Sequence, residues 1–152
     1  SEFVSELLAK RGKLTPGKIN DKLLAEMEFA FLKAKEVGKL DIGQSLLAKD
    51  KAVVAVEAME GTDQCILRAG KIAGDNTVMA KIAKAEQDLR FDIPTVGLKT
   101  IENLCKIKAK ALILEAEKTF ILEKDKFIKK AEKAGIAVWA VSHDSGGVRW
   151  ER

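Results

Sequence analysis

The sequence has little of what several common kinds of active site require. It contains one histidine, two cysteines, two prolines and no tyrosine, and only 5% of its 152 residues are aromatic. A Ser-His-Asp triad, a Cys-His pair and a histidine zinc site all need histidine. The single His143 lies near the C-terminus, in a segment without apolar periodicity. Chemistry of these kinds is therefore not expected, which leaves the chemistry of oxygen ligands.

The cysteines and the apolar runs restrict the class of protein further. Cys65 and Cys105 fall on separate predicted helices, with no second pair for a disulfide framework or a thiolate metal cage. No apolar run approaches the ~20 residues that cross a bilayer, and the first residues lack a signal-peptide pattern. These features predict a reduced, cytoplasmic protein without a membrane span.

The charge is mildly basic, with 27 basic against 23 acidic residues and a net charge of +4. Such an excess suits an anionic partner but does not identify one. No cluster of aromatic residues among basic ones is present, so nucleic acid is not the expected partner. A basic RNA-binding protein remains a weaker alternative, and its sign would be salt-dependent retention on nucleic acid.

Hydrophobic periodicity predicts alternating helices and strands along the chain. Helices are expected over residues 1–12 and from Asn20 or Asp21 to Val37, followed by a β-hairpin over residues 44–58 and a helix from Thr62, its N-cap, to Ile72. The remaining pattern predicts a strand at 78–83, a loop at 84–97, a helix at 98–106, strands at 111–115 and near 120, a helix at 125–134 and a strand at 136–141. The prediction is one α/β domain over residues 1–142, with a mixed β-sheet, flanking helices and an N-terminal β-hairpin, and a flexible tail at 143–152.

Two segments concentrate the polar chemistry. The first has a glycine at a predicted helix start and contains Glu57, Glu60, Thr62 and Asp63; the second, in the predicted loop, contains Gln87, Asp88, Arg90 and Asp92. Carboxylate, water and phosphate oxygens are the ligands that Mg²⁺ prefers, and a helix N-terminus suits a phosphate group. The two segments therefore fit a magnesium-phosphate site better than a zinc site.

Each of these residues also has a purely structural interpretation, which composition alone favours. Thr62 and Asp63 would be ordinary helix caps, and Glu57 and Glu60 the solvated end of a strand. In the loop, Arg90 would form an exposed ion pair worth ~0–1 kcal/mol with a neighbouring aspartate.

Three further polar residues near these segments have the same two interpretations. Lys81 and Lys84, which flank the loop, either hold phosphate oxygens or are solvated. Gln44 either donates to a ligand or merely begins the hairpin.

Three ordered motifs give the sequence a resemblance to a known family. They are Asp41-Ile42-Gly43-Gln44, then Val56-Glu57-Ala58-Met59-Glu60-Gly61-Thr62-Asp63, then Lys81-x-Ala83-Lys84-x-x-Gln87-Asp88-x-Arg90-Phe91-Asp92-x-Pro94-x-x-Gly97. Together they resemble the C-terminal half of the UDP-2,3-diacylglucosamine pyrophosphatases of lipid A biosynthesis. The resemblance extends from Leu14 to the strand near Val141, which is nearly the whole chain except the tail.

The resemblance implies Mg²⁺-dependent hydrolysis, with Mn²⁺ as an alternative ion, of UDP-2,3-diacylglucosamine to UMP and 2,3-diacylglucosamine 1-phosphate. It implies catalytic roles for Asp88, Asp92 and Arg90. Substrate binding is expected from Gln44, Thr62, Lys84 and Gln87. Metal binding is expected from Asp63, Glu60 and Asp88.

Two departures from the family pattern affect these expectations. Glu86 stands where the family usually has a glycine before the Gln-Asp pair, and the family's N-terminal domain is missing from this sequence. The expected partners are the UDP-linked acylated glucosamine, that N-terminal domain and the inner face of the membrane, with homo-oligomers left open. The alternative function is a non-catalytic module of the same fold that binds phosphate or nucleotide, or docks a partner.

Overall fold

A computed structural model of the protein describes residues 2–84 and 93–150. Within these residues, seven strands form one sheet in the order β1-β8-β6-β4-β2-β3, with β9 beside β8. The strands are β1 (Gly12–Lys13), β2 (Ser45–Lys49), β3 (Ala52–Val56), β4 (Val78–Lys81), β6 (Ala111–Glu115), β8 (Ala137–Asp144) and β9 (Gly147–Arg149). The predicted α/β class and mixed sheet are confirmed.

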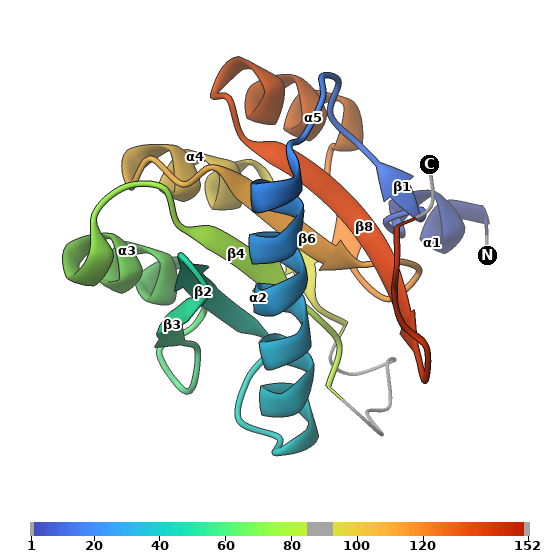
Figure 1. The fold of residues 1–152 in the computed structure, drawn as a ribbon. Helices are drawn as coiled ribbons and strands as arrows, with labels where there is room; N and C mark the ends of the chain where they lie inside the picture. The colour runs from blue at the N-terminus through green and yellow to red at the C-terminus, as the bar shows by residue number, and fades with distance from the viewer. Residues whose placement is uncertain (1, 85–92, 151–152) are drawn as a thin grey trace.

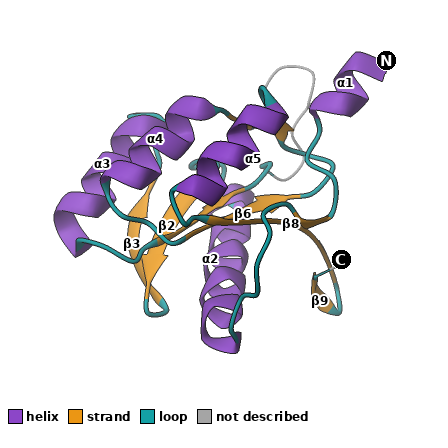
Figure 2. Ribbon diagram, turned by 90° about the horizontal axis from the view of Figure 1, so that it is seen from above, coloured by secondary structure: helices purple, strands orange, loops and turns teal. Residues whose placement is uncertain are grey.

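Helices cover both faces of this sheet. The helices are α1 (Glu2–Leu7), α2 (Asp21–Lys39), α3 (Thr62–Ala73), α4 (Leu98–Lys106) and α5 (Lys124–Lys133), and a small pair is formed by β5 (Thr95–Val96) and β7 (Phe120–Ile121). Figures 1 and 2 show α2 on one face of the sheet and α3, α4 and α5 on the other. None of the described helices has both the length and the apolar content that a membrane crossing needs.

The strands are apolar on both faces because both faces are covered. On β4, Met79 belongs to the core beneath α3, α4 and α5, whereas Val78 and Ala80 belong to the core beneath α2. This two-residue alternation follows from the pleat of the strand. It also means that Lys81, two residues after Met79, lies on the α3 side.

Strand direction gathers several chain ends at one edge of the sheet. β4, β6 and β8 are parallel, while β2 is antiparallel to both β4 and β3. The carboxyl ends of β3, β4 and β6 therefore lie at the same edge as the start of β2, and we call this the carboxyl edge. In α/β sheets, ligands bind outside this edge.

The hairpin of β2 and β3 confirms the prediction for residues 44–58. Its two central residues, Asp50 and Lys51, have φ angles of 49° and 61°. Positive φ at both positions is the geometry of a type I′ turn, whose twist matches that of the flanking strands.

The prediction of a helix over residues 1–12 is wrong in part. The first helix ends at Leu7 rather than near residue 12, because Ala9 exchanges backbone hydrogen bonds with Thr119 and Glu117, and Gly12–Lys13 pairs with β8. Long-range pairing here overrides local helical spacing.

The predicted tail is a β-hairpin as far as Arg149. The rings of Trp139 and Trp150 make an edge-to-face contact with centroids 5.0 Å apart, and His143 lies edge-on to Phe31 at 6.1 Å. Val148 also packs against the core beneath α2. The polar and glycine-rich sequence does not indicate these contacts, and the flexibility expected of residues 143–152 stays a prediction.

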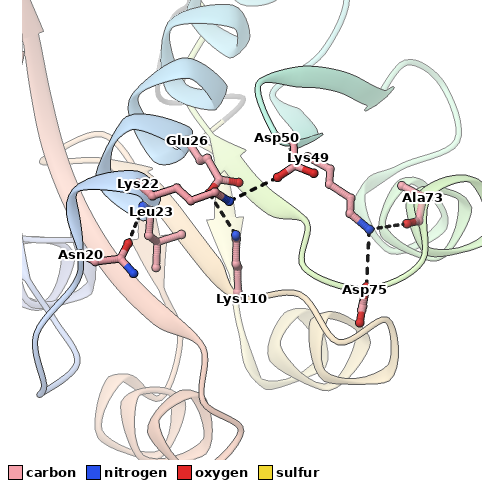
Figure 3. Close-up of polar contacts among 9 residues, drawn as sticks. All are labelled: Asn20, Lys22, Leu23, Glu26, Lys49, Asp50, Ala73, Asp75 and Lys110. Atoms are coloured by element: carbon pink, nitrogen blue, oxygen red, sulfur yellow. Dashed lines mark hydrogen bonds and ion pairs between the residues drawn. The ribbon is translucent and has the colours of Figure 1, made fainter.

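The opposite, amino edge of the sheet is closed by the polar contacts drawn in Figure 3. Asn20 caps α2 by accepting a hydrogen bond from the Leu23 N–H at 2.8 Å. The buried Glu26 carboxylate accepts hydrogen bonds from Lys22 at 3.1 Å and Lys110 at 3.0 Å. Lys49 donates to the carbonyl of Ala73 at 2.9 Å.

Glu26 predicts a pH dependence of stability. Burial by itself raises the pKa of this carboxyl, but the hydrogen bonds from Lys110 and Lys22 outweigh burial and hold the pKa below its usual range. A group with a lowered folded-state pKa stabilises the fold above its unfolded pKa of about 4.3 and loses that contribution as pH falls through the folded value. Denaturant unfolding between about pH 6 and pH 3 should therefore show a smaller acid-induced loss for Glu26→Gln than for the wild type. Equal losses would contradict the assignment.

Candidate functional site

Four polar side chains meet at the carboxyl edge. Lys81 Nζ donates to Thr62 Oγ1 at 2.6 Å and to Ser45 Oγ at 3.1 Å, and the two hydroxyl oxygens are 3.4 Å apart. Thr62 Oγ1 in turn donates a longer bond of 3.4 Å to Glu57 Oε2. We call these four residues the carboxyl-edge cluster. It joins β2, β4 and the loop between β3 and α3.

The pleat and register of the sheet account for this meeting. Ser45 and Lys81 are direct cross-strand partners, and both point to the face on which α3 begins. Gly43 brings the start of β2 against the end of β3, because a Cβ atom there would lie 1.9 Å from the Glu57 carbonyl oxygen. A side chain at position 43 would therefore push these two segments apart.

Lys81 is buried rather than solvated, with only 4% of its surface exposed. The structural interpretation of this lysine as a solvated strand end is therefore wrong. The sequence contained one signal, which is a lysine directly after the apolar residues Val78 to Ala80. A lysine is almost never fully buried unless it is paired, so its neighbours at this edge need explanation.

Thr62 does not cap α3, which corrects the structural interpretation of this residue. The N-cap is Gly61 with a φ of 87°, and no side chain caps the helix start. The Thr62 hydroxyl is instead held between Lys81 and Glu57. The positive φ of Gly61 lets the chain turn sharply enough to place Thr62 there.

Glu57 contributes an oxygen that has no hydrogen-bond partner in the part of the chain that the structure describes. Its Oε1 atom is buried and lacks such a partner there, while Oε2 accepts the bond from Thr62. An unsatisfied buried carboxylate oxygen is costly, since even a neutral group left in this way costs about 1–3 kcal/mol. A ligand that offers a donor or a cation would satisfy this atom. Glu57, which the sequence placed in the first polar segment without a catalytic, binding or metal role, is therefore a functional candidate.

Glu60 and Asp63 lie close in the sequence but point to other partners. Glu60 accepts hydrogen bonds from the Ala58 N–H at 3.1 Å and from Arg68 at 3.0 Å, and these two contacts lower the pKa of its carboxyl. Asp63 accepts from Asn103 Nδ2 at 2.9 Å, which links α3 to α4. The contacts of both carboxylates therefore lead away from Lys81.

The remaining predicted site residues are placed only in part. Gln87, Asp88, Arg90 and Asp92 lie outside the described residues. Lys84 lies just beyond β4 and pairs with Asp41 at 3.3 Å. Gln44 is half-buried, and its backbone carbonyl accepts a hydrogen bond from the Ile82 N–H at 2.9 Å.

Glu115 is a further residue at this edge that the sequence analysis missed. Its Oε1 accepts the Ala83 N–H at 3.0 Å, and its Oε2 pairs with Lys35 at 2.8 Å. It therefore fixes the chain where it leaves β4 toward the second polar segment. The signal was a carboxylate at the end of the apolar run Ala111 to Leu114.

The donor set of this edge suits a hard cation better than a soft one. Apart from the lysine, the cluster offers hydroxyl and carboxylate oxygens, and burial raises the pKa of the nearby Cys65 thiol to about 12, so that it stays protonated. Within residues 2–84 and 93–150, no three acidic, histidine or cysteine side chains come together as a metal centre. The predicted metal set of Asp63, Glu60 and Asp88 stays a prediction, since Asp88 lies outside that part.

The fold and the cluster together define an open α/β domain whose candidate polar site lies beyond the carboxyl ends of parallel strands. Residues 10–139 match the model of the LpxI C-terminal domain family, and the chain belongs to that family.

One curated relative is the UDP-2,3-diacylglucosamine pyrophosphatase LpxI of Caulobacter vibrioides, which is 31% identical over 150 residues. That alignment covers 92% of this chain and 53% of the relative, so the chain spans about half the length of the protein it matches.

Proposed function

We propose that this chain is the C-terminal domain of a pyrophosphatase that hydrolyses UDP-2,3-diacylglucosamine to UMP and 2,3-diacylglucosamine 1-phosphate. The observation that carries the proposal is the contact between Thr62, in the first polar segment, and Lys81, at the end of the strand that precedes the second. Lys81, from which the second segment departs, bonds directly to Thr62 of the first. This contact lies at the carboxyl edge of the sheet. The chain belongs to the LpxI C-terminal domain family, and its curated relative is named a UDP-2,3-diacylglucosamine pyrophosphatase.

The residues of the second segment supply the proposed chemistry. Asp88 either aligns the attacking water or holds the metal, with Asp92 and Asp63 in support. Arg90 and Lys84 neutralise the charge that develops on the phosphoryl group. Gln44, Thr62 and Gln87 bind the substrate.

The proposed metal is Mg²⁺, with Mn²⁺ as the alternative. Glu57 Oε1, a buried oxygen without a hydrogen-bond partner among the described residues, is suited to face such an ion or its bound water. When bound, the ion would offset negative charge on the diphosphate. Lys81 would hold Thr62, and through it the Glu57 carboxylate, in a fixed orientation.

The proposed setting follows from the substrate. A nucleotide-linked lipid places the enzyme at the cytoplasmic face of a membrane, and the relative's length implies an N-terminal domain as partner. Hydrolysis by this domain alone would then be slow or absent. The alternative is a non-catalytic module that binds phosphate or nucleotide or docks a partner.

Two measurements on this chain test the proposal and separate it from the alternative. Incubation with UDP-2,3-diacylglucosamine and Mg²⁺ should release UMP if the domain is catalytic. Calorimetric titration with UMP should show binding that requires Mg²⁺. The absence of both hydrolysis and Mg²⁺-dependent binding would refute the proposal. Mg²⁺-dependent binding without turnover, even when the N-terminal domain is supplied, would favour the module.

Replacing Lys81 tests the cluster itself. Lys81→Met removes an ammonium that donates to Thr62 and Ser45, and charge-assisted bonds contribute about 1.5–3 kcal/mol each. We expect Mg²⁺-dependent UMP binding to weaken at least about tenfold. Lys129→Met, which changes an exposed lysine of α5, is the matched control and should bind as the wild type does. Wild-type affinity in folded Lys81→Met would exclude the cluster from the site.

A further inference from the structure

An open groove of about 1000 Å³ runs along the outer side of α3. Gln64, Leu67, Arg68 and Lys71 line it, and their spacing places them on one face of the helix. The other wall is the turn after α4, at Lys106, Ile107 and Lys108. Figure 2 shows α3 and α4 side by side at this place.

The floor of the groove is apolar because α3 and the end of α4 approach closely. Leu67, Gly70 and Ile107 line it. A Cβ atom at Gly70 would lie 2.3 Å from Ile107 Cγ2, so this glycine allows the close approach. The floor therefore suits a hydrocarbon chain.

The charged side chains around this floor differ in whether they have ion-pair partners among the described residues. Arg68 is held by Glu60 and by the carbonyl of Val56. Asp75 pairs with Lys49 at 3.4 Å. The exposed side chains of Lys71, Lys106 and Lys108, by contrast, have no ion-pair partner within residues 2–84 and 93–150. The end of the groove that these lysines surround therefore carries excess positive charge.

We propose that this groove binds an anionic membrane lipid, with an acyl chain over Leu67, Gly70 and Ile107 and the phosphate among Lys71, Lys106 and Lys108. The charge complementarity and the apolar floor select this occupant. The purpose of the contact rests on the proposed function, because an enzyme with a lipid substrate must work at a bilayer surface. The lipid site is distinct from the carboxyl-edge cluster, and Glu60 at the opposite end of the groove separates the two.

Alkyl phosphates of increasing chain length test the proposal on this chain. Octyl, decyl and dodecyl phosphate below their micelle concentrations, with inorganic phosphate as the chainless probe, are titrated while amide chemical shifts are recorded. We expect shifts at Leu67, Gly70, Lys71 and Ile107. Affinity should rise at least about threefold for each added pair of methylenes, with roughly fifteenfold expected for complete burial.

Two pairs of variants distinguish the contribution of the ligand's acyl chain from that of the positive charge of the groove. Leu67→Glu should remove the dependence on chain length, whereas Leu40→Glu, at an exposed leucine outside the groove, should not. The double variant Lys106→Glu/Lys108→Glu should weaken binding of all alkyl phosphates, and of vesicles containing phosphatidylglycerol, at least about tenfold. Lys129→Glu, on α5, is the control for a general loss of positive charge. Melting curves verify that each variant is folded.

The outcomes are distinguishable from those that test the proposed function. Affinity independent of chain length, or shifts confined to other surfaces, would overturn the lipid assignment even if UMP binds with Mg²⁺. Equal weakening of alkyl phosphate binding by Lys129→Glu would show that net charge alone causes the effect, and would also overturn the lipid assignment. A dimer in solution that Leu67→Glu dissociates, without alkyl phosphate binding, would make the groove an interface between copies instead.

Discussion

Asp88→Ala is expected to reduce release of UMP from UDP-2,3-diacylglucosamine by about a thousandfold or more while the melting temperature stays unchanged. The reason is that the proposed role of Asp88 is to align the attacking water or hold the metal, and removal of a group with such a role commonly costs several kcal/mol of transition-state stabilisation. Its position in a polar segment after β4 predicts that no core contact is lost.

The measurement is UMP formation with Mg²⁺, supported by thermal unfolding of the variant. Asp125→Ala, on an exposed residue of the first turn of α5, is the control and should retain wild-type turnover. If the wild-type domain alone releases no UMP, Mg²⁺-dependent UMP binding is measured in place of turnover. If Asp88→Ala releases UMP, or binds UMP with Mg²⁺, nearly as the wild type does, the assignment is wrong.

Glu115→Ala should lower the free energy of unfolding by about 3–5 kcal/mol, the cost of breaking a buried ion pair by removing one partner. The side chains of Lys35 and Glu115 are 15% and 5% exposed, and their N–O distance is 2.8 Å. The substitution leaves the Lys35 ammonium and the Ala83 N–H without their carboxylate. In a domain of this size the melting temperature should fall by roughly 10 °C.

Denaturant unfolding provides the measurement, and two further variants sharpen it. Glu132→Ala removes an exposed carboxylate of α5 and should change stability by no more than about 0.5 kcal/mol. Lys35→Met/Glu115→Leu removes both charges and should recover part of the loss, because no uncompensated charge remains. A Glu115→Ala protein as stable as wild type would show that this pair does not anchor the end of β4.

Local pattern was enough to predict the elements whose own residues determine them. α2 has a polar cap at Asn20, helical apolar spacing and a basic last turn, and each of these acts within one element. The hairpin likewise follows from two aliphatic runs separated by three polar residues. Parallel and antiparallel pairing were expected only in general terms, since a sequence without an alignment does not report which strands are neighbours.

The elements that sequence reasoning missed are short and depend on distant partners. β1 consists of two residues and exists because β8 offers it an edge. β9 is polar, and Trp150 gains order by packing on Trp139, eleven positions earlier on the preceding strand. No local period signals such pairings, because the stabilising contact is made by residues elsewhere in the chain.

The candidate site divides in the same way. Composition identified the two polar segments, and the family resemblance predicted substrate binding by Thr62, but the structural roles suggested for Thr62 and Lys81 were wrong. A lysine at a strand end is usually solvated, and its burial here arises because α3 begins above it. Glu57 and Glu60 lie three positions apart in one segment, and no feature of the sequence distinguishes the carboxylate that faces the cluster from the one bound to Arg68.

The sequence by itself determined the α/β class and the family resemblance, because composition, periodicity and ordered motifs are properties of the chain alone. Tertiary structure alone decided which polar groups share one edge of the sheet. Strand order and pleat direction bring together four residues that are up to 36 positions apart, namely Ser45, Glu57, Thr62 and Lys81. Glu60, by contrast, bonds to Arg68 of α3.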